Sequence, residues 1–414
     1  MPSPRVIPAL ADLTQDIAGP VPVGLLQDWG SGRADLESAQ ALLRPFEITG
    51  TVVASDTSGL TRLTHEMDLL DVLRLISRPK EIIHALGTGI GGQAVGRWVA
   101  DNTEMYYPAP VGVGVVVDAM SEAQFRISGA SRVAVGMCVH PGLFYQIGGT
   151  LYGHDASIVG ALAEHCAGPG EILLTREAVA GLPDASPYAL RPRADLAVHH
   201  GAGVFTLAGG RRWPGLAAAD PRYPHPFTDD FFESLLGLEA HPDPSAVKQR
   251  LYATYRRERA IALVAGEPSP DVSDDLTGML DALVTNTCLD VIVRETAGRD
   301  GSIVTSGGGL ALLTFDTTRE AVEFAQVLRA RGADNGIPVR IGIDQGPVLL
   351  FATPDGAKSI AGDAINIASK LAEDAGRAGR ISVTTRAAAR LDPAPAGEPF
   401  QVTVSSVLLT GITL

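Results

Sequence analysis

Hydrophobic and polar residues follow two successive patterns in the C-terminal part of the chain. Between residues 339 and 343 apolar residues alternate with Arg and Gly, which predicts a half-buried strand. From residue 362 to residue 373 the apolar residues recur at helical spacing, which predicts a helix with one face against a core. Asn366 and Lys370 stand four residues apart on the other face of this helix. An amide and a cation therefore share one helix surface after a strand and a loop.

The same kinds of pattern predict a series of elements in the first part of the chain. Residues 1–30 are rich in Pro and Gly and predict no regular structure, whereas Asp35 suits the N-cap of a short helix that Pro45 ends. Four further elements are predicted: a strand over 51–55, a helix over 60–86 with a break at Pro79, a hairpin through Tyr107 with its turn at Asp101-Asn102, and a strand over 133–139 that ends before His140-Pro141-Gly142.

An internal repeat divides the chain. Residues 153–182 recur without a gap as residues 362–391, an offset of 362 − 153 = 209. Identical pairs include Gly153/Gly362, Ile158/Ile367, Leu162/Leu371, Ala163/Ala372, Glu164/Glu373, Gly170/Gly379, Ile172/Ile381 and Thr175/Thr384. Identities spread over a whole helix–turn–strand unit indicate a tandem duplication.

The repeat predicts the domain organisation. We expect an N-terminal segment over 1–44, a first domain over 45–208, a Pro-rich linker over 209–258 and a second domain over 259–414. The linker carries two short helix-like segments. We interpret the second, the basic KQRLYATYRRERA, as a solvated linker helix.

Composition narrows the possible partners. The net charge of −14 argues against a nucleic-acid polymer or an anionic membrane, although a local metal site would still admit a free nucleotide. Three cysteines, without metal-ligand spacing, are typical of a reducing cytoplasm. No apolar run is long enough to predict insertion into a bilayer.

The strand–loop–helix over 339–373 resembles the signature of the class III nucleotidyl cyclase catalytic domain. In that family the helix carries an Asn and, four residues later, an Arg, which orient the ribose and stabilise the triphosphate in the transition state. Here Asn366 matches the first position and Lys370 occupies the second. The resemblance implies an α/β chain of two ferredoxin-like cyclase domains that form an intramolecular pseudo-dimer.

The resemblance also supplies positions for a two-metal site in the first domain. In the family one Asp ends the first strand and a second Asp lies at a hairpin turn, six residues before an aromatic residue. Asp56 and Asp101 match these positions, and they would hold Mg²⁺ or Mn²⁺. The loop after Asp56 would cradle the phosphates, and its residues are Thr57, Ser58, Gly59 and Leu60.

Each copy lacks what the other retains. The second copy has Glu267 near the first carboxylate position and Gly309 at the second, and a glycine cannot ligate a metal. The first copy has Ser157 and Ala161 where the second has its Asn and Lys. In the family such domains pair head to tail, and each shared site takes metals from one domain and the Asn/Arg helix from the other. One composite site is therefore expected, and the opposite site should have no chemistry left.

The remaining positions leave two functions open. Thr305 and Ser359 occupy the base-recognition positions, Lys370 lacks the planar fork of Arg, and the C-terminal LLTGITL lacks the Lys that clamps the triphosphate in many relatives. The leading function is conversion of a purine nucleoside triphosphate, ATP rather than GTP, to its 3′,5′-cyclic monophosphate and pyrophosphate. The alternative is an inactive cyclase-like module that binds a nucleotide or a partner protein. Self-association also stays open.

Overall fold

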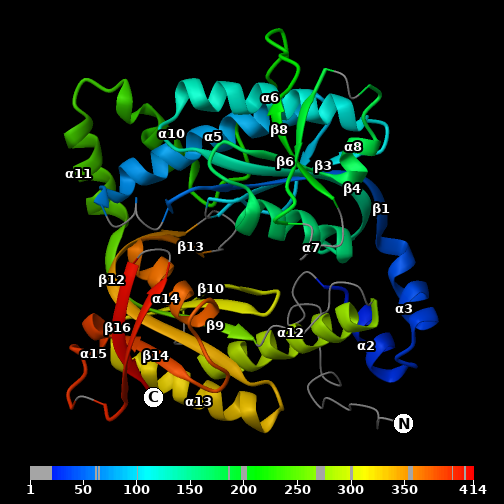
Figure 1. Cartoon of the computed structure of the whole chain (residues 1–414). Coiled ribbons are helices and arrows are strands. Elements are labelled where there is room, and N and C mark those ends of the chain that lie inside the picture. The colour runs from blue at the N-terminus through cyan, green and yellow to red at the C-terminus, as the bar shows by residue number, and fades with distance from the viewer. Residues whose placement is uncertain are drawn as a thin grey trace.

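The computed structural model describes residues 21–60, 63, 66–99, 101–184, 187–196, 203–266, 276–298, 302–352, 358–393, 395–404 and 407–414. Two α/β halves lie one above the other, the first in blue to green and the second in yellow to red (Figure 1). The strands of the first half are β1 (Glu47–Thr57), β2 (Gln93–Ala94), β3 (Thr103–Pro108), β4 (Val135–Ile147), β5 (Thr150–Tyr152), β6 (Ile172–Thr175), β7 (Ala189–Pro192) and β8 (Val204–Gly209). Those of the second half are β9 (Arg256–Gly266), β10 (Ser302–Gly307), β11 (Leu310–Phe315), β12 (Val339–Ala352), β13 (Lys358–Ala361), β14 (Ile381–Thr384), β15 (Glu398–Val404) and β16 (Val407–Thr413).

Both halves have the same sheet topology. The order is β2-β3-β1-β4-β6-β8-β7 in the first sheet and β10-β11-β9-β12-β14-β16-β15 in the second. In addition β5 pairs with β4, and β13 pairs with β12. The match, strand for strand, confirms the predicted fold class of two tandem α/β domains.

Helices cover both faces of each sheet. The main helices are α5 (Leu69–Gly89), α6 (Val113–Ala130) and α7 (His154–Ala161) in the first half, and α12 (Leu276–Ala297), α13 (Thr318–Asp334) and α14 (Asp363–Glu373) in the second. Alternation along β1 assigns the faces, because Val53 packs with α5 and α6 whereas Val52 and Ala54 pack with α7. In the second half α12 and α13 cover one face and α14 covers the other. The short helices α8 (Arg176–Ala180) and α15 (Thr385–Ala388) follow β6 and β14.

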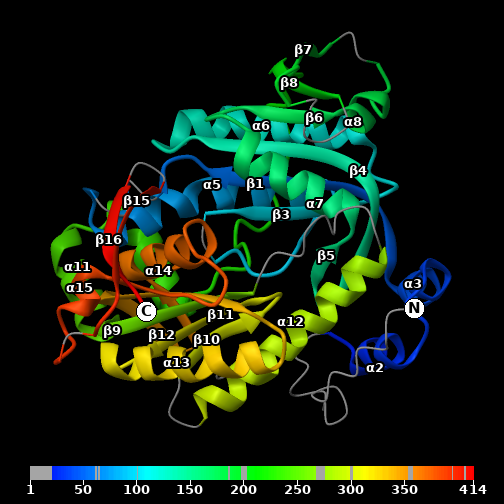
Figure 2. The same cartoon turned by 60° about the horizontal axis from the view of Figure 1, so that its bottom comes forward.

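The two halves exchange strand ends. Tyr145 and Ile147, at the end of β4, are buried in the core of the second half. Leu349 and Phe351, in the last part of β12, are buried in the core of the first half. The halves therefore pack in a reciprocal, head-to-tail manner, with α7 and α14 both facing the other half (Figures 1 and 2).

The N-terminal segment packs on the second half although it leads into the first. Helix α2 (Val23–Ser31) and helix α3 (Leu36–Leu43) lie against α12, and Trp29 Nε1 donates to Asp281 Oδ1 at 3.0 Å (Figure 2). Asp35 caps α3, as predicted, by accepting from the amide of Ser38. The prediction of no regular structure before residue 31 is wrong for α2, because its apolar residues find a tertiary partner that composition alone does not reveal.

Helix α12 is long and apolar enough to span a membrane by length and composition. It is the one such helix among the described residues, and 56% of its apolar window is buried inside the protein. Its apolar surface is explained by its neighbours, since the sheet lies on one side and α2 and α3 on the other.

The linker is exposed over much of its length but is anchored by buried apolar residues. Its helices, α10 (Asp229–Leu236) and α11 (Pro244–Tyr255), are followed by the basic run 256–259 at the start of β9, not within a helix. Phe231 and Leu251 are buried in the core of the first half, and the ring of Phe231 lies 4.5 Å from that of Phe351 on β12. The linker helices therefore pack against α5 of the first half and β12 of the second. The solvated-helix interpretation is wrong for the buried side of α11, which carries Val247 and Leu251, and for residues 256–259, which begin β9.

Two predicted boundaries also change. Helix α5 continues through Pro79 instead of breaking there. The hairpin of β2 and β3 is real, but β2 ends at Ala94 and β3 begins at Thr103, so the two strands are not joined by a tight turn at Asp101-Asn102. Lys80 is buried and donates to the carbonyl of Trp98, between these strands, at 3.1 Å.

Candidate functional site

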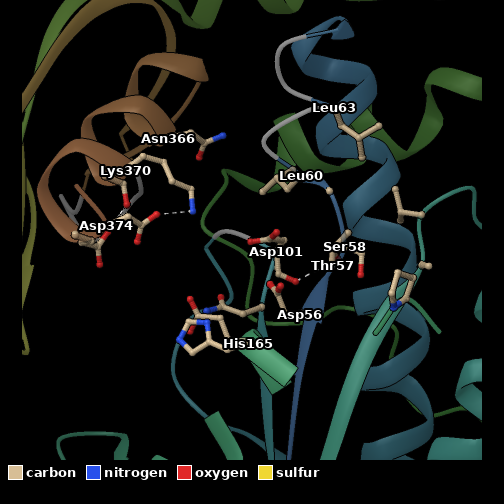
Figure 3. Close-up of a pocket in the computed structure, with 18 of the residues that line it drawn as sticks. Asp56, Thr57, Ser58, Leu60, Leu63, Asp101, His165, Asn366, Lys370 and Asp374 are labelled. Carbon is tan, nitrogen blue, oxygen red and sulfur yellow. Dashed lines mark hydrogen bonds and ion pairs between the residues drawn. The ribbon is translucent and has the colours of Figure 1, made fainter. Parts of the chain in front are cut away.

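A cavity of about 1060 Å³ lies between the two halves. The first half contributes Asp56 and Asp101, and the second half contributes Asn366 and Lys370 (Figure 3). The other lining residues are Thr57, Ser58, Gly59, Leu60, Leu63, Asn102, Arg132, Val133, Ala134, Glu164, His165, Pro169, Leu310, Ser369, Glu373 and Asp374. The structure thus brings together the four residues that the sequence predicted for one composite site.

The sheet places the two carboxylates next to each other. Asp56 stands near the end of β1, a central strand that pairs with both β3 and β4. Asp101 ends the loop that leads into β3, and its carbonyl accepts a bond from Thr57 Oγ1 at 3.3 Å. Two residues farther along each strand, Ser55 Oγ and Thr103 Oγ1 lie 2.6 Å apart. These bonds fix the loop against the end of β1 (Figure 3).

The electrostatics of the cavity connect the two halves. Burial, followed by the negative charges of Asp101 and Glu164, raises the pKa of Asp56 to about 7. Burial also raises the pKa of Asp101, and the charge of Glu164 adds to that shift. The ammonium of Lys370, from the second half, acts in the opposite direction on the pKa of both carboxyls. Repulsion among the carboxylates creates a site where added positive charge is favourable.

This donor set fits a divalent cation that shares its coordination with a substrate. Among the residues that the structure describes, no group of three or more His, Cys, Asp or Glu side chains is arranged to hold a metal ion. Mg²⁺ needs no such group, because it commonly binds one or two carboxylates, several waters and the phosphates of a substrate. Asp56 and Asp101 would therefore be the protein ligands.

Helix α14 presents Asn366 and Lys370 toward the carboxylates (Figure 3). Its other face is buried, and the helix lies close to β12 because Gly342 leaves room there: a Cβ atom on Gly342 would be 2.1 Å from the carbonyl oxygen of Ala368. Lys370 Nζ lies 3.0 Å from Asp374 Oδ2 on the same helix. The ammonium that faces the cavity is thus already partly neutralised.

The predicted phosphate loop lines the cavity, whereas the predicted base-recognition residues are not among its described lining residues. Residues 57–60 all line the cavity next to Asp56. Thr305, on β10, is exposed, and Ser359, on β13, is buried; neither is among the described residues that line the cavity. Their role in reading the base stays a prediction.

Several lining residues were not predicted. Glu164 and His165 lie on a single π-helical turn, η3 (Leu162–Cys166), that follows α7, and a π-turn has no signature in the sequence. The repeat did contain a signal for Glu164, because it is identical to Glu373 and both residues line this cavity. Arg132 follows α6 and belongs to none of the motifs considered.

A second, smaller cavity lies between α7 of the first half and α12 of the second. It measures about 300 Å³, and Ser157 lines it from α7. The remaining lining residues are Glu104, Leu151, Tyr152, Gly153, Ala156, Met279, Ala282, Leu283 and Asn286. Gly309, at the lost carboxylate position, has φ +85°, and a Cβ atom there would be 2.6 Å from Asn286 Oδ1. Glu267, the other candidate of this half, lies outside the described residues.

Solved structures share this fold. A class III adenylyl cyclase-like ATP-binding protein from Pseudomonas aeruginosa is 13% identical and matches over 83% of this chain and 85% of its own, with a TM-score of 0.51. The adenylyl cyclase CyaB of P. aeruginosa is 16% identical over 40% of this chain and 96% of its own (TM-score 0.32). An adenylate/guanylate cyclase/hydrolase from Silicibacter pomeroyi is 22% identical over 38% of this chain and 95% of its own (TM-score 0.31). No family model and no curated protein sequence matches the chain. The resemblance to tandem class III cyclase domains is confirmed at the level of the fold.

Proposed function

We propose that the chain binds a purine nucleoside triphosphate and a divalent metal in the cavity between its halves and forms the 3′,5′-cyclic monophosphate and pyrophosphate, with ATP favoured over GTP. One observation carries the proposal: two carboxylates of the first half share a cavity with Asn366 and Lys370 of the second. Lys370 also acts on the pKa of both carboxyls, so these three charged groups are within electrostatic reach of one another.

The reaction needs three things from the protein. The 3′-oxygen forms a bond to the α-phosphorus, its proton passes to water, and the bond to the bridging oxygen breaks, so that pyrophosphate leaves with the electron pair. Mg²⁺ or Mn²⁺, held by Asp56 and Asp101, would lower the pKa of the 3′-hydroxyl and neutralise phosphate charge. The amide of Asn366 can both donate to and accept from the ribose, which would align the attacking oxygen. The ammonium of Lys370 would stabilise charge that develops on the phosphates.

Base selection would be weak. Thr305 and Ser359 carry hydroxyl groups, which donate or accept equally well, so they impose no fixed donor–acceptor pattern on a purine. We therefore propose only a modest preference among purines, within about tenfold.

A second function is favoured by one contact. Asp374 is 3.0 Å from Lys370 and withdraws part of the positive charge that the transition state would need. A cavity with this ion pair can bind a nucleotide without turning it over. The P. aeruginosa neighbour, described as a cyclase-like ATP-binding protein, supports this alternative.

The net charge and the free cysteines support a free nucleotide as the partner and the cytoplasm as the location. The net charge of −14 favours a free nucleotide over a nucleic-acid polymer as partner. Cys138, Cys166 and Cys288 are all free thiols, in keeping with a cytoplasmic location. A protein partner or self-association would be additional to the nucleotide.

The test is an incubation of purified protein with Mg²⁺ or Mn²⁺ and, separately, ATP, GTP, CTP and UTP, followed by mass spectrometry of the products. Cyclic monophosphate plus pyrophosphate in equal amounts is the expected result. Binding of a triphosphate without any product would support the second function. Failure of all four nucleotides to bind would contradict both.

A further inference from the structure

Arg132 stands at the rim of the cavity on a backbone that local bonds hold in place. Helix α6 ends just before it, and the amide of Ser131 donates to the carbonyl of Ile127 at 2.8 Å. The amide of Val133 donates to Ser131 Oγ at 3.2 Å, and the Val133 side chain is only 6% exposed. A capped helix end, a side-chain turn and a buried anchor thus flank Arg132, whose own side chain is exposed.

This segment is bonded directly to the predicted phosphate loop. The amide of Ser58 donates to the carbonyl of Ala134 at 3.0 Å, which extends the β1–β4 ladder by one pair beyond Thr57 and Val135. Arg132 is two residues from that bond and lines the same cavity as Ser58. Its position relative to the loop is therefore set by the sheet.

The charge of the cavity leaves Arg132 as its available cation. Five carboxylates line the cavity, namely Asp56, Asp101, Glu164, Glu373 and Asp374, against two cations, Lys370 and Arg132. Lys370 is paired with Asp374 at 3.0 Å. In the part of the chain that the structure describes, Arg132 forms no hydrogen bond and no ion pair.

We propose that Arg132 binds the terminal phosphates of the nucleoside triphosphate, an inference that rests on the nucleotide-binding function proposed above. A guanidinium presents parallel N–H donors that match two phosphate oxygens, and no other arginine lines this cavity among the described residues. The C-terminal strand β16 ends in LLTGITL, without a lysine that could hold the triphosphate from the second half. Arg132 would supply that contact from the first half.

An adjoining cavity provides a control. It measures about 810 Å³, and Arg132 lines it together with Arg74 and Arg78. Arg74 is paired with Glu239 at 2.9 Å and Arg78 with Glu81 at 3.3 Å, so both guanidinium groups already have carboxylate partners. Neither lines the large cavity. Arg74 is therefore a nearby arginine that should not touch the nucleotide.

The experiment measures binding by calorimetry at constant Mg²⁺, with 3′-deoxy-ATP and 3′-deoxy-AMP, which lack the attacking hydroxyl and cannot be cyclised. Arg132→Gln should weaken 3′-deoxy-ATP binding on the order of 10- to 100-fold and leave 3′-deoxy-AMP binding unchanged. Arg132→Lys should fall between wild type and Arg132→Gln, because it keeps the charge without the fork. Arg74→Gln should bind both nucleotides as wild type does.

The outcomes separate this inference from the function on which it rests. If wild type binds the triphosphate and Arg132→Gln binds it equally well, the role of Arg132 is overturned and the proposed function stands. An equal loss for both nucleotides would also overturn it, since it would indicate a general disturbance of the cavity. If wild type binds no triphosphate, the proposed function fails and the role of Arg132 fails with it.

Discussion

The two cavities between the halves arise from the same fold but differ in size and chemistry. One measures about 1060 Å³ and gathers five carboxylates around Lys370 and Arg132. The other measures about 300 Å³, and Glu104 is the one carboxylate among its described lining residues. The duplicated fold therefore conserves the interface geometry, while the side chains decide where chemistry is possible.

The difference follows from head-to-tail sharing. Each cavity takes carboxylate positions from one half and helix positions from the other. Ser157, where the Asn is missing, lines the small cavity together with Asn286, and Gly309, where the carboxylate is missing, lies directly against Asn286. Losses that look scattered over two domains in the sequence therefore fall on one side of the pseudo-dimer, and the other side keeps a full set.

The largest expected effect is the loss of a carboxylate from the large cavity. Asp101→Asn keeps the shape of the side chain but removes the charge that would hold the metal, and turnover should fall by roughly 10³-fold. The measurement is the rate of cyclic nucleotide formation at saturating Mg²⁺.

Glu104→Gln is the matched control, because it makes the same chemical change three residues away in a carboxylate that lines the small cavity. It should alter turnover less than about threefold, because Glu104 is not among the described residues that line the large cavity. Equal losses in both variants would contradict the assignment of chemistry to one cavity.

A smaller effect is expected at the helix that faces the carboxylates. Lys370→Ala should lower turnover on the order of 10²-fold, because it removes a cation that acts mainly as charge develops in the transition state. Lys370→Arg should raise turnover and change nucleotide affinity little, since two parallel donors replace one point charge.

Introducing an Asn and a Lys at the matching positions of α7 tests the comparison from the side of the first half. Ser157→Asn combined with Ala161→Lys restores the Asn and the cation on α7, yet it should create no second activity, because Gly309 still supplies no ligand. Activity from that double variant in an Asp101→Asn background would refute the comparison of the cavities.

Sequence patterns predicted individual strands and helices and the repeat because these depend on local periodicity and spacing, whereas the four central residues were assigned from the resemblance to the class III cyclase signature. Strand β1 ends within two residues of its predicted end, at Thr57, and Asp35 caps α3 as expected. The packing of α2 and of the linker was missed, because an apolar helix face does not specify its partner and Phe231 meets Phe351 from 120 residues away (351 − 231 = 120). Arg132 and His165 were missed for a different reason. They reach the cavity through an irregular turn and a π-turn, which carry no periodic signal.

Restoring the lost carboxylate should fail for a steric reason. Gly309 has φ +85°, where an L-residue is strained, and its Cβ position is 2.6 Å from Asn286 Oδ1. Gly309→Asp should therefore lower the free energy of unfolding by about 1–3 kcal/mol in urea titrations and create no metal site. Gly308→Asp is the control, because Gly308 has φ +64° but no atom within 4 Å of its Cβ position, so only the backbone strain applies. A loss no greater than in this control would mean that Asn286 moves aside readily.

The last prediction concerns pH and uses Asp56. Its pKa in the folded protein, about 7, lies above the ordinary 3.8, mainly because of burial and then because of the charges of Asp101 and Glu164. Below pH 7 the carboxyl is protonated, so metal binding must displace a proton. The apparent affinity for Mg²⁺ should therefore fall about tenfold per pH unit below 7 and level off above it.

The stability of the metal-free protein should change in the opposite direction, because Asp56 contributes less to it as pH rises. Between about pH 4 and pH 7 the folded state holds a proton that the unfolded state has released, so the contribution of Asp56 to stability declines as pH rises through this window.

Calorimetric titrations with Mg²⁺ from pH 5.5 to 8.5 measure how metal affinity depends on pH, and thermal unfolding without metal measures how stability depends on pH. Glu104, whose pKa burial also raises to about 7, titrates in the same range, and Glu104→Gln should keep the slope of metal affinity. Asp56→Asn should lose that slope and unfold at a higher temperature than wild type at pH 8. If the slope persists in Asp56→Asn, the proton that metal binding displaces comes from another group.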